Sequence, residues 1–313
     1  MTLDRGAFIA ATAGALVAQN LATLRVLSFP SDAAKQILYP MQAGIFRKHG
    51  VQIDLSSMGG GAAIIAAVVG GSAEFGAGSL FPVFTAYGHG IPVRMVAPIS
   101  IYDTDRCDTW LLVRSDSGIH TPQDLNGKTM AADSPTDIYV IATQVWMDQH
   151  GGDGKSIKAV GMNAGEQLAA LQQGRIDMVM LKPPFLTVAM GSGRVRVLGK
   201  PLDVIAPRFL VSCWVATTDY IAKNPAAVTA FVAGLMEGAR YTNRHQDATV
   251  DMVARFSKQD PAQIKAGVRT VLAETLALPY IQRPLDFAYK YGVIDKQYDA
   301  RVLLSPFVPL SRA

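Results

Sequence analysis

The sequence predicts an α/β protein of two lobes, each a mainly parallel sheet with flanking helices, connected by two hinge crossings. Three observations lead to this fold class. Strand-like and helical patterns alternate from residue 24 onward, the same order of elements recurs about 100 residues later, and an extended apolar run follows each copy. A chain of 313 residues is long enough for two such lobes.

The first copy of the layout begins with an expected strand over 24–28 and a helix over 33–49 that Gly50 ends. The alternation of Val51, Ile53 and Leu55 predicts the second strand. The elements expected after it are a helix over 62–69, a strand over 73–77, a helix over 81–87 and a strand over 93–98. Strands separated by helices of this length are typical of a parallel sheet.

The second copy repeats this order at an offset of 103 residues, at which Gly71 aligns with Gly174 and Gly90 with Gly193. Its expected strands cover 128–132, 157–161, 176–181 and 195–198, and its expected helices cover 136–150, 166–173 and 185–190. Sequence identity between the copies is low, so the prediction is one layout used twice.

Two extended runs, Cys107–Arg114 (CDTWLLVR) and Phe209–Ala216 (FLVSCWVA), are interpreted as the hinge crossings. The predicted domains are therefore 23–108 with 215–313 as lobe 1 and 109–214 as lobe 2. Helices expected over 225–241, 247–257, 261–276 and 284–291 have no strand partners. We expect them to pack on lobe 1.

Residues 1–22 have the layout of a cleavable secretory signal peptide. Arg5 precedes twelve uncharged residues, Gly6 to Val17, and small residues at Ala18 and Ala22 offer cleavage ends. The alternative is a buried N-terminal helix. With a signal peptide the mature protein would work outside the cytoplasm.

Composition excludes several function classes. Half of the residues are hydrophobic and 17% are charged, which argues against disorder. The net charge of +4 comes without a Lys/Arg run, so no nucleic-acid surface is expected. Two cysteines and five scattered histidines make no metal motif, and no catalytic triad or phosphate loop is present. We therefore expect no catalytic residues, no metal and no cofactor.

Five segments resemble the periplasmic substrate-binding proteins of the aliphatic sulfonate, nitrate and taurine class, also called the NMT1/THI5-like class. They are Leu38–Leu55 (LYPMQAGIFRKHGVQIDL), Ala66–Gly76 (AAVVGGSAEFG), Ser117–Ala131 (SGIHTPQDLNGKTMA), Leu168–Asp177 (LAALQQGRID) and Pro184-Phe185. The order and spacing of these segments carry the resemblance, which covers roughly residues 24–245.

The resemblance implies a type II periplasmic-binding fold, in which lobe 2 interrupts lobe 1 and the two close on a ligand. It also implies a periplasmic, monomeric solute-binding component of an ABC importer. Its partners would be a small-molecule ligand and a membrane permease with its ATPase. The mild positive charge, the helix N-termini and Lys182 favour a small organic anion, a sulfonate or carboxylate, and Phe29 and Trp214 would permit an aromatic one.

Ligands of such sheets bind beyond the carboxyl ends of the strands, where helix N-termini point. Phe29 could stack on a ligand or cap the core, and Gly60 with Gly61 could let the backbone approach a ligand or form a tight turn. Ser79 could face the cleft or only cap a helix. The candidates in lobe 1 are Phe29, Ser31, Gly60, Gly61, Gly78 and Ser79.

Lys182 is the most informative candidate in lobe 2, because it is aligned with the strand end at Ser79 in the repeat. It could pair with a carboxylate or sulfonate, or be a solvated surface lysine. The class often has an acidic or aromatic residue near this point, so the ligand need not be the usual one. Asp137 would repel an anion, and we expect it to point away. The candidates in lobe 2 and the crossings are Thr109, Ser134, Thr136, Lys182 and Trp214.

Cys107 and Cys213 lie on the two crossings, where a disulfide would staple the hinge if their Cα atoms lie within about 7 Å. Two free thiols are the alternative. Two other functions also stay open: an enzyme on the same fold, as in pyrimidine or menaquinone biosynthesis, and a sensor domain of a regulator.

Overall fold

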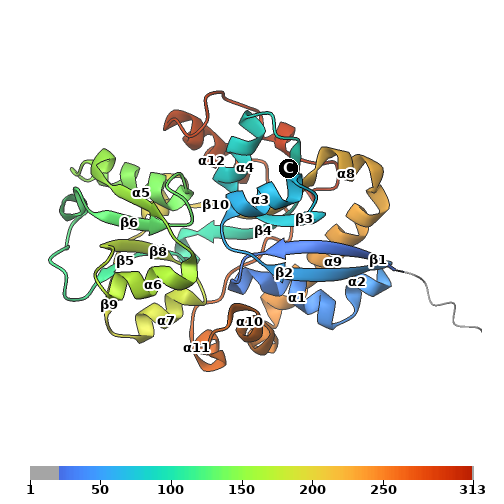
Figure 1. Cartoon of the computed structure of the whole chain (residues 1–313), viewed down its shortest axis with the longest axis horizontal. Helices are drawn as coiled ribbons and strands as arrows, with labels where there is room; N and C mark the ends of the chain where they lie inside the picture. The colour runs from blue at the N-terminus through green and yellow to red at the C-terminus, as the bar shows by residue number, and fades with distance from the viewer. Residues whose placement is uncertain (1–20, 312–313) are drawn as a thin grey trace, which may run out of the picture.

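The computed structural model describes residues 21–311 and contains two lobes, each with a five-stranded sheet (Figure 1). The first sheet has the order β2-β1-β3-β10-β4, with β1 (Ala22–Ser28), β2 (Val51–Ser57), β3 (Phe75–Ser79), β4 (Val93–Asp103) and β10 (Arg208–Thr217). The second has the order β7-β6-β8-β5-β9, with β5 (Trp110–Arg114), β6 (Thr129–Ala132), β7 (Lys158–Gly161), β8 (Met178–Leu181) and β9 (Val195–Gly199). The predicted two-lobe α/β fold is confirmed.

The two sheets share one topology. In the first, β1 pairs parallel with β2 and β3, while β10 runs antiparallel between β3 and β4. In the second, β6 pairs parallel with β7 and β8, while β5 runs antiparallel between β8 and β9. Each antiparallel strand is the one that the chain enters on arriving from the other lobe. Each sheet is therefore mixed: four of its five strands point the same way, as expected for a mainly parallel sheet, but the fifth makes two of the sheet's four pairings antiparallel.

The predicted crossings are displaced by this arrangement. β10 pairs with β3 and β4 from Arg208 to Thr217, so residues 208–214 belong to the first sheet and the lobe 2 boundary at residue 214 is wrong. Likewise Trp110–Arg114 is a strand of the second sheet. A central strand that is buried on both faces has the same uninterrupted apolar sequence as a buried crossing, which is why the two could not be told apart. The connections lie at 104–109 and 200–207.

Helices cover both faces of each sheet, as expected for βαβ units. In lobe 1 they are α1 (Lys35–Gln42), α2 (Ile45–Lys48), α3 (Gly61–Val69) and α4 (Leu80–Gly88). In lobe 2 they are α5 (Ile138–Gln149), α6 (Ala164–Gln172) and α7 (Phe185–Gly191). The helix expected over 33–49 is split because Gly44 adopts φ 69°, which breaks the helical path. Gly71 and Gly174, aligned by the repeat, share a positive φ of 76° and 71°.

The C-terminal helices pack mainly on lobe 1, as predicted (Figure 1). They are α8 (Thr218–Lys223), α9 (Pro225–Arg244), α10 (Val250–Ser257), α11 (Pro261–Ala266) and α12 (Pro279–Lys290). α9 lies against α1, and α12 lies against β10 and α4. The helix predicted over 261–276 is wrong beyond Ala266, because Leu272 and Leu276 form bridges with Ser100 and Leu310 instead. α11 also touches α7 of lobe 2.

A buried charged cluster ties the loop after β1 to the C-terminal part of the chain. The fully buried Asp32 carboxylate accepts hydrogen bonds from Lys35 Nζ and from the Thr270 N–H, both at 2.7 Å. Arg269 donates two bonds to its other oxygen, at 2.9 and 2.7 Å. Burial opposes the ionisation of Asp32, but Lys35 and Arg269 together hold its pKa below the ordinary value. The carboxylate is therefore charged and paired.

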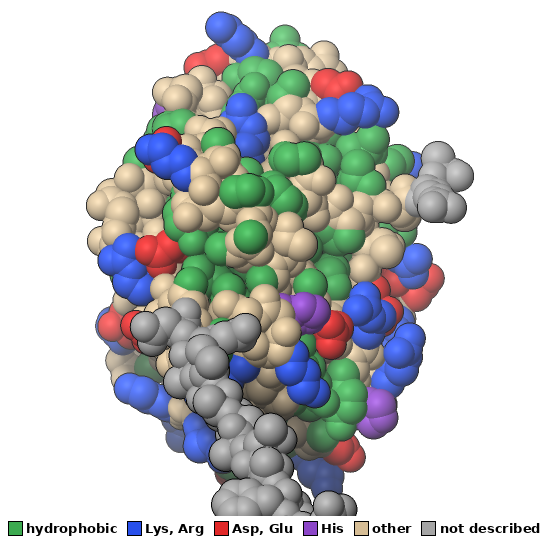
Figure 2. All heavy atoms as spheres, turned by 90° about the vertical axis from the view of Figure 1, so that its right-hand side faces the viewer, with side chains coloured by type: hydrophobic (Ala, Val, Ile, Leu, Met, Phe, Trp, Pro, Cys, Tyr) green, Lys and Arg blue, Asp and Glu red, His purple; other side chains and the backbone are tan. Residues whose placement is uncertain are grey.

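Basic and acidic side chains are interspersed over the outer face of lobe 1 (Figure 2). The excess of four positive charges is thus not gathered into one patch on this face. Over residues 21–311, no helix is both long and apolar enough to cross a membrane. The expected signal peptide lies almost wholly outside the described residues.

Asp32→Asn should lower the free energy of unfolding by about 3–5 kcal/mol, because it leaves Lys35, which has no exposed side-chain surface, without its counter-charge. Urea unfolding followed by circular dichroism measures this. Asp219→Asn is the control: its ion pair with Lys223 is about 70% exposed at both ends, and its loss should cost less than about 1 kcal/mol. Equal losses in the two variants would contradict the role given to Asp32.

Candidate ligand-binding site

A cavity of about 190 Å³ lies between the two lobes. It opens at the carboxyl ends of β1, β2 and β3 on one side and of β6, β7 and β8 on the other, where the sequence placed a ligand. Lobe 1 contributes Phe29, Pro30, Ser31, Gly59 and Ser79 to its wall. Lobe 2 contributes Asp133, Asp137, Tyr139, Asn163, Ala164, Gly165, Gln167, Met180, Leu181, Lys182, Pro183 and Phe185.

The lobes touch around the cavity, so the structure is closed. The Asp32 N–H donates a hydrogen bond to the Pro183 carbonyl across the interface, at 3.2 Å. At another point Gly59 meets Asn163, where an added Cβ would lie 2.7 Å from the Asn163 side-chain oxygen. A small molecule in this cavity would be held by both lobes at once.

Three of the predicted lobe 1 candidates, Phe29, Ser31 and Ser79, line the cavity. The three glycines do not, and each has a packing role instead. Gly60 turns the chain into α3 with φ 81°, and a Cβ on Gly61 would lie 3.2 Å from the Ser79 amide. A Cβ on Gly78 would lie 2.9 Å from Val83. These glycines let the loops that carry Ser79 and Gly59 pack closely.

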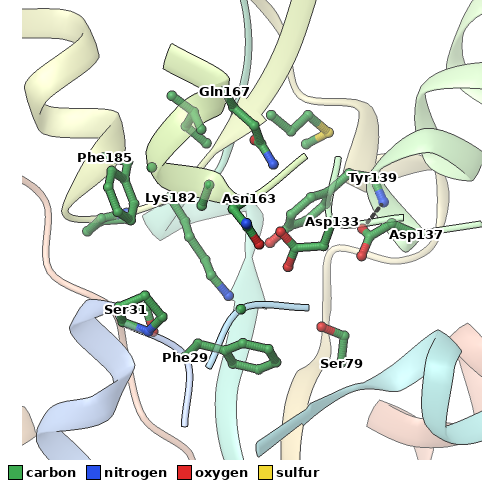
Figure 3. Close-up of a pocket in the computed structure, with 17 residues that line it drawn as sticks. Phe29, Ser31, Ser79, Asp133, Asp137, Tyr139, Asn163, Gln167, Lys182 and Phe185 are labelled. Atoms are coloured by element: carbon green, nitrogen blue, oxygen red, sulfur yellow. Dashed lines mark hydrogen bonds between the residues drawn. The ribbon is translucent and has the colours of Figure 1, made fainter. Parts of the chain in front are cut away.

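Lys182 is the predicted lobe 2 candidate that lines the cavity. Its ammonium group lies 5.7 Å from the centre of the Phe29 ring, so this lobe 2 side chain reaches cation–π range of a lobe 1 residue (Figure 3). Within residues 21–311, Lys182 belongs to no ion pair. Its positive charge is therefore available to a ligand.

Four other candidates lie away from the cavity. Trp214 is fully buried in lobe 1, where its indole N–H donates to Gln36 at 2.8 Å and its ring packs edge-on against Phe231. Trp214 was a ligand-binding candidate, but it lies in a central strand and does not line the cavity. Ser134 and Thr136 face each other at 3.4 Å on the loop before α5. Thr109 is buried beside Asp108, to which its hydroxyl donates at 2.9 Å.

Asp137 contradicts the expectation that it points away from the cleft, because it lines the cavity and is only 4% exposed. It is the N-cap of α5, and its Oδ1 accepts a hydrogen bond from the Tyr139 N–H at 2.9 Å. This cap fixes the carboxyl group at the end of β6, facing inward (Figure 3). Burial, reinforced by the neighbouring Asp133, raises the pKa of Asp137 to about 7.

Asp133 lies beside Asp137 on the same wall (Figure 3). Burial also raises its pKa, while the positive charge of Lys182 acts in the opposite direction. Over the described chain its carboxylate accepts no hydrogen bond, so it has no structural partner to explain its position.

The loop after β7 contributes residues that the sequence analysis missed. Asn163, Ala164 and Gly165 line the cavity at the N-terminus of α6, and Gln167 holds the loop by donating to the Met162 carbonyl at 2.8 Å. The rule that ligands bind at strand ends applies to this loop as well. The sequence predicts the start of this helix at Glu166, whereas α6 begins two residues earlier, at Ala164.

Cys107 and Cys213 are both free thiols, so the hinge disulfide is absent. The Cys107 thiol donates to the Thr109 carbonyl at 3.0 Å, and Cys213 is buried in β10 of the first sheet. The pairing required Cys213 to lie on a crossing, and β10 is not one. In the described residues, no cluster of three or more His, Cys, Asp or Glu could hold a metal ion.

Comparison with known proteins places this geometry in a family. The model of the NMT1/THI5-like family matches residues 35–249. A putative aliphatic sulfonates-binding protein of Escherichia coli is 25% identical over 200 residues, which is 61% of this chain and 60% of that protein. The match thus spans less than two thirds of that relative.

Solved structures share the fold. The periplasmic aliphatic sulphonate binding protein SsuA from Escherichia coli aligns with a TM-score of 0.71 and 20% identity, over 93% of this chain and 94% of that one. The alkanesulfonate-binding protein SsuA from Xanthomonas axonopodis pv. citri, bound to MOPS, aligns with a TM-score of 0.74 and 17% identity, over 91% and 98%. At these identities the likeness establishes the two-lobe fold.

The Asp137 carboxyl should make stability depend on pH. Its pKa rises from 3.8 in the unfolded chain to about 7 on folding, so its contribution to stability is present below pH 3.8 and is lost as the pH rises through about 7. Relative to Asp137→Asn, the wild type should lose on the order of 3 kcal/mol of unfolding free energy between pH 4 and 8.

Urea unfolding of the ligand-free protein at a series of pH values measures this difference. Asp260→Asn is the matched control, because exposed Asp260 makes the same kind of cap bond, from the Ala262 N–H at 2.8 Å. Parallel pH curves for the wild type and Asp137→Asn would contradict the assignment.

Proposed function

The chain belongs to the NMT1/THI5-like family, and we propose that it is the solute-binding component of an ABC importer. The observation that carries this proposal is the closed cavity between the lobes. A small molecule placed there would touch the strand ends of both sheets, and its binding would couple to hinge closure. A permease can distinguish the closed form from an open one, which is what an importer requires of its binding protein.

The ligand is a small molecule with an acidic group. Ligand sites for drug-sized compounds have volumes of about 300–1,000 Å³, and this cavity, at about 190 Å³, is smaller. The unpaired Lys182 ammonium supplies a positive charge at its wall. The first turn of α6, at Ala164 and Gly165, adds the positive end of a helix dipole. A sulfonate or carboxylate on a short chain fits both features.

The protein acts as a monomer outside the cytoplasm, in the periplasm, and delivers its ligand to a membrane permease with its ATPase. The expected signal peptide and the similarity to a periplasmic binding protein support this location. The relatives are named as binding proteins, which favours binding over the enzyme alternative.

Native mass spectrometry of the freshly purified protein, followed by a thermal-shift panel of sulfonates, carboxylates, nitrate and amines, tests the proposal. We expect a bound small acid, or a rise in Tm with one class of acids. A protein that no acid stabilises, or one that converts the bound molecule chemically, would contradict it.

Lys182→Met should weaken the binding of acids about tenfold to a hundredfold, because a charge-assisted contact to the acidic group is lost. Isothermal titration calorimetry measures the affinity. Lys158→Met is the matched control, since Lys158 is an exposed lysine on β7 of the same lobe and away from the cavity. Unchanged affinity in Lys182→Met would remove Lys182 from the site.

A further inference from the structure

The walls of the cavity carry an acidic side as well as a basic one. Among the residues that line it, three have charged side chains: Asp133, Asp137 and Lys182. The lobe 1 wall, at Phe29, Ser31 and Ser79, carries no charge to balance them. With both carboxylates ionised, the lining therefore has a net negative charge, although Lys182 alone suggests an anion site.

The carboxylates of Asp133 and Asp137 have few structural partners. In the part of the chain that the structure describes, neither belongs to an ion pair, and the Asp133 side chain accepts no hydrogen bond. Asp137 uses Oδ1 for its helix cap, while its Oδ2 accepts no bond even though the residue is only 4% exposed. A largely buried carboxyl group that lines a cavity and has an oxygen without a protein partner is available to a hydrogen-bond donor of a ligand.

A ligand with only an acidic group would suit this cavity poorly. It would pair with Lys182, but it would also bring a third negative charge close to those of Asp133 and Asp137 in a space that closure shields from water. A ligand with only an amine could pair with the two carboxylates, but its positive charge would be repelled by the Lys182 ammonium group. A molecule with both groups satisfies both sides.

We propose, building on the proposed function, that the ligand is a small zwitterion whose acidic group binds at Lys182 and whose ammonium group binds at Asp133 and Asp137. Figure 3 shows the arrangement: the two carboxylates lie side by side at the end of β6, and Lys182 extends from the end of β8 toward Phe29. Asp133 and Asp137 are thereby specificity-determining residues for the ammonium group.

Matched ligand pairs test the proposal by isothermal titration calorimetry. The pairs are 3-aminopropanesulfonate with propanesulfonate, and 4-aminobutanoate with butanoate. The amino compound of at least one pair should bind about tenfold tighter or more, as expected for a charge-assisted bond to a carboxylate. Equal or tighter binding of the compounds without an amino group would overturn the zwitterion and leave the proposed function intact. Failure of all four to bind would count against the proposed acid site itself.

Two variants separate recognition from folding. Asp137→Asn and Asp133→Asn should each weaken the amino compounds by about tenfold while leaving the plain acids unchanged or tighter. If Asp137→Asn does not fold, Asp133→Asn decides, because its side chain makes no hydrogen bond within residues 21–311. Equal weakening of both members of a pair would overturn the proposal.

The pH dependence gives a readout that a structural role would not produce. The groups acting on the Asp137 carboxyl, whose pKa is about 7, are Asp133 on the same loop, the Tyr139 N–H of α5 and Lys182 beyond β8. As the pH rises from 6 to 8, the ionising carboxylate should strengthen binding of the amino compounds and weaken binding of the plain acids. The same trend for both kinds of ligand would overturn the proposal.

Discussion

The Asp32 carboxylate holds together parts of the chain that are far apart in the sequence. Its side chain joins the end of β1 to Lys35 at the start of α1 and to Arg269 and Thr270 after α11. Its backbone N–H reaches across the interface to the Pro183 carbonyl of lobe 2. Phe29 and Ser31 line the cavity immediately before this residue, so the cluster also fixes part of the binding wall. A charge buried this deeply is stable only with all its partners present, which makes the positions of these segments interdependent.

The repeated topology explains why polar and charged side chains lie at the interface between the two lobes. Each sheet presents the carboxyl ends of three parallel strands to the other lobe, and each of those strands leads into a helix N-terminus. Equivalent positions in the two copies therefore face one another across the cavity. Ser79 ends β3 and Lys182 follows β8, and these strands are equivalent in the two sheet orders. The shared topology places equivalent residues on opposite sides of the cavity. The differences in residue type at those positions, such as serine at one and lysine at the other, determine which chemical groups the cavity presents.

Much of this could be predicted from sequence. Periodicity and glycine positions located most elements within a few residues, and the offset between the copies indicated Lys182. Prediction fails where one apolar pattern is compatible with two kinds of segment. The run from Phe209 to Ala216 is apolar because it is a central strand, yet a hinge crossing would have the same sequence. Trp214 and Cys213 were misplaced for that single reason. Charge repulsion alone predicts that Asp137 points away from the cleft, but the helix cap, a bond from the Tyr139 N–H, orients the side chain inward.

The distribution of charged residues over the two lobes links ligand binding to closure of the lobes. Asp133 and Asp137 lie on lobe 2, so an ammonium group could reach them in the open form, before the lobe 1 wall arrives. Lys182 also lies on lobe 2, but its ammonium group contacts Phe29 of lobe 1 only when the lobes meet. The lobes meet at Gly59 and Asn163, where a Cβ on residue 59 would lie 2.7 Å from the Asn163 side-chain oxygen and would require that side chain to shift. Lobe 2 thus contributes all the charged side chains of the cavity lining, while lobe 1 contributes an uncharged wall that packs against it at Gly59. Under the proposed function, a ligand's charged groups would therefore be recognised by one lobe, and the space left for the rest of it would be limited by the other.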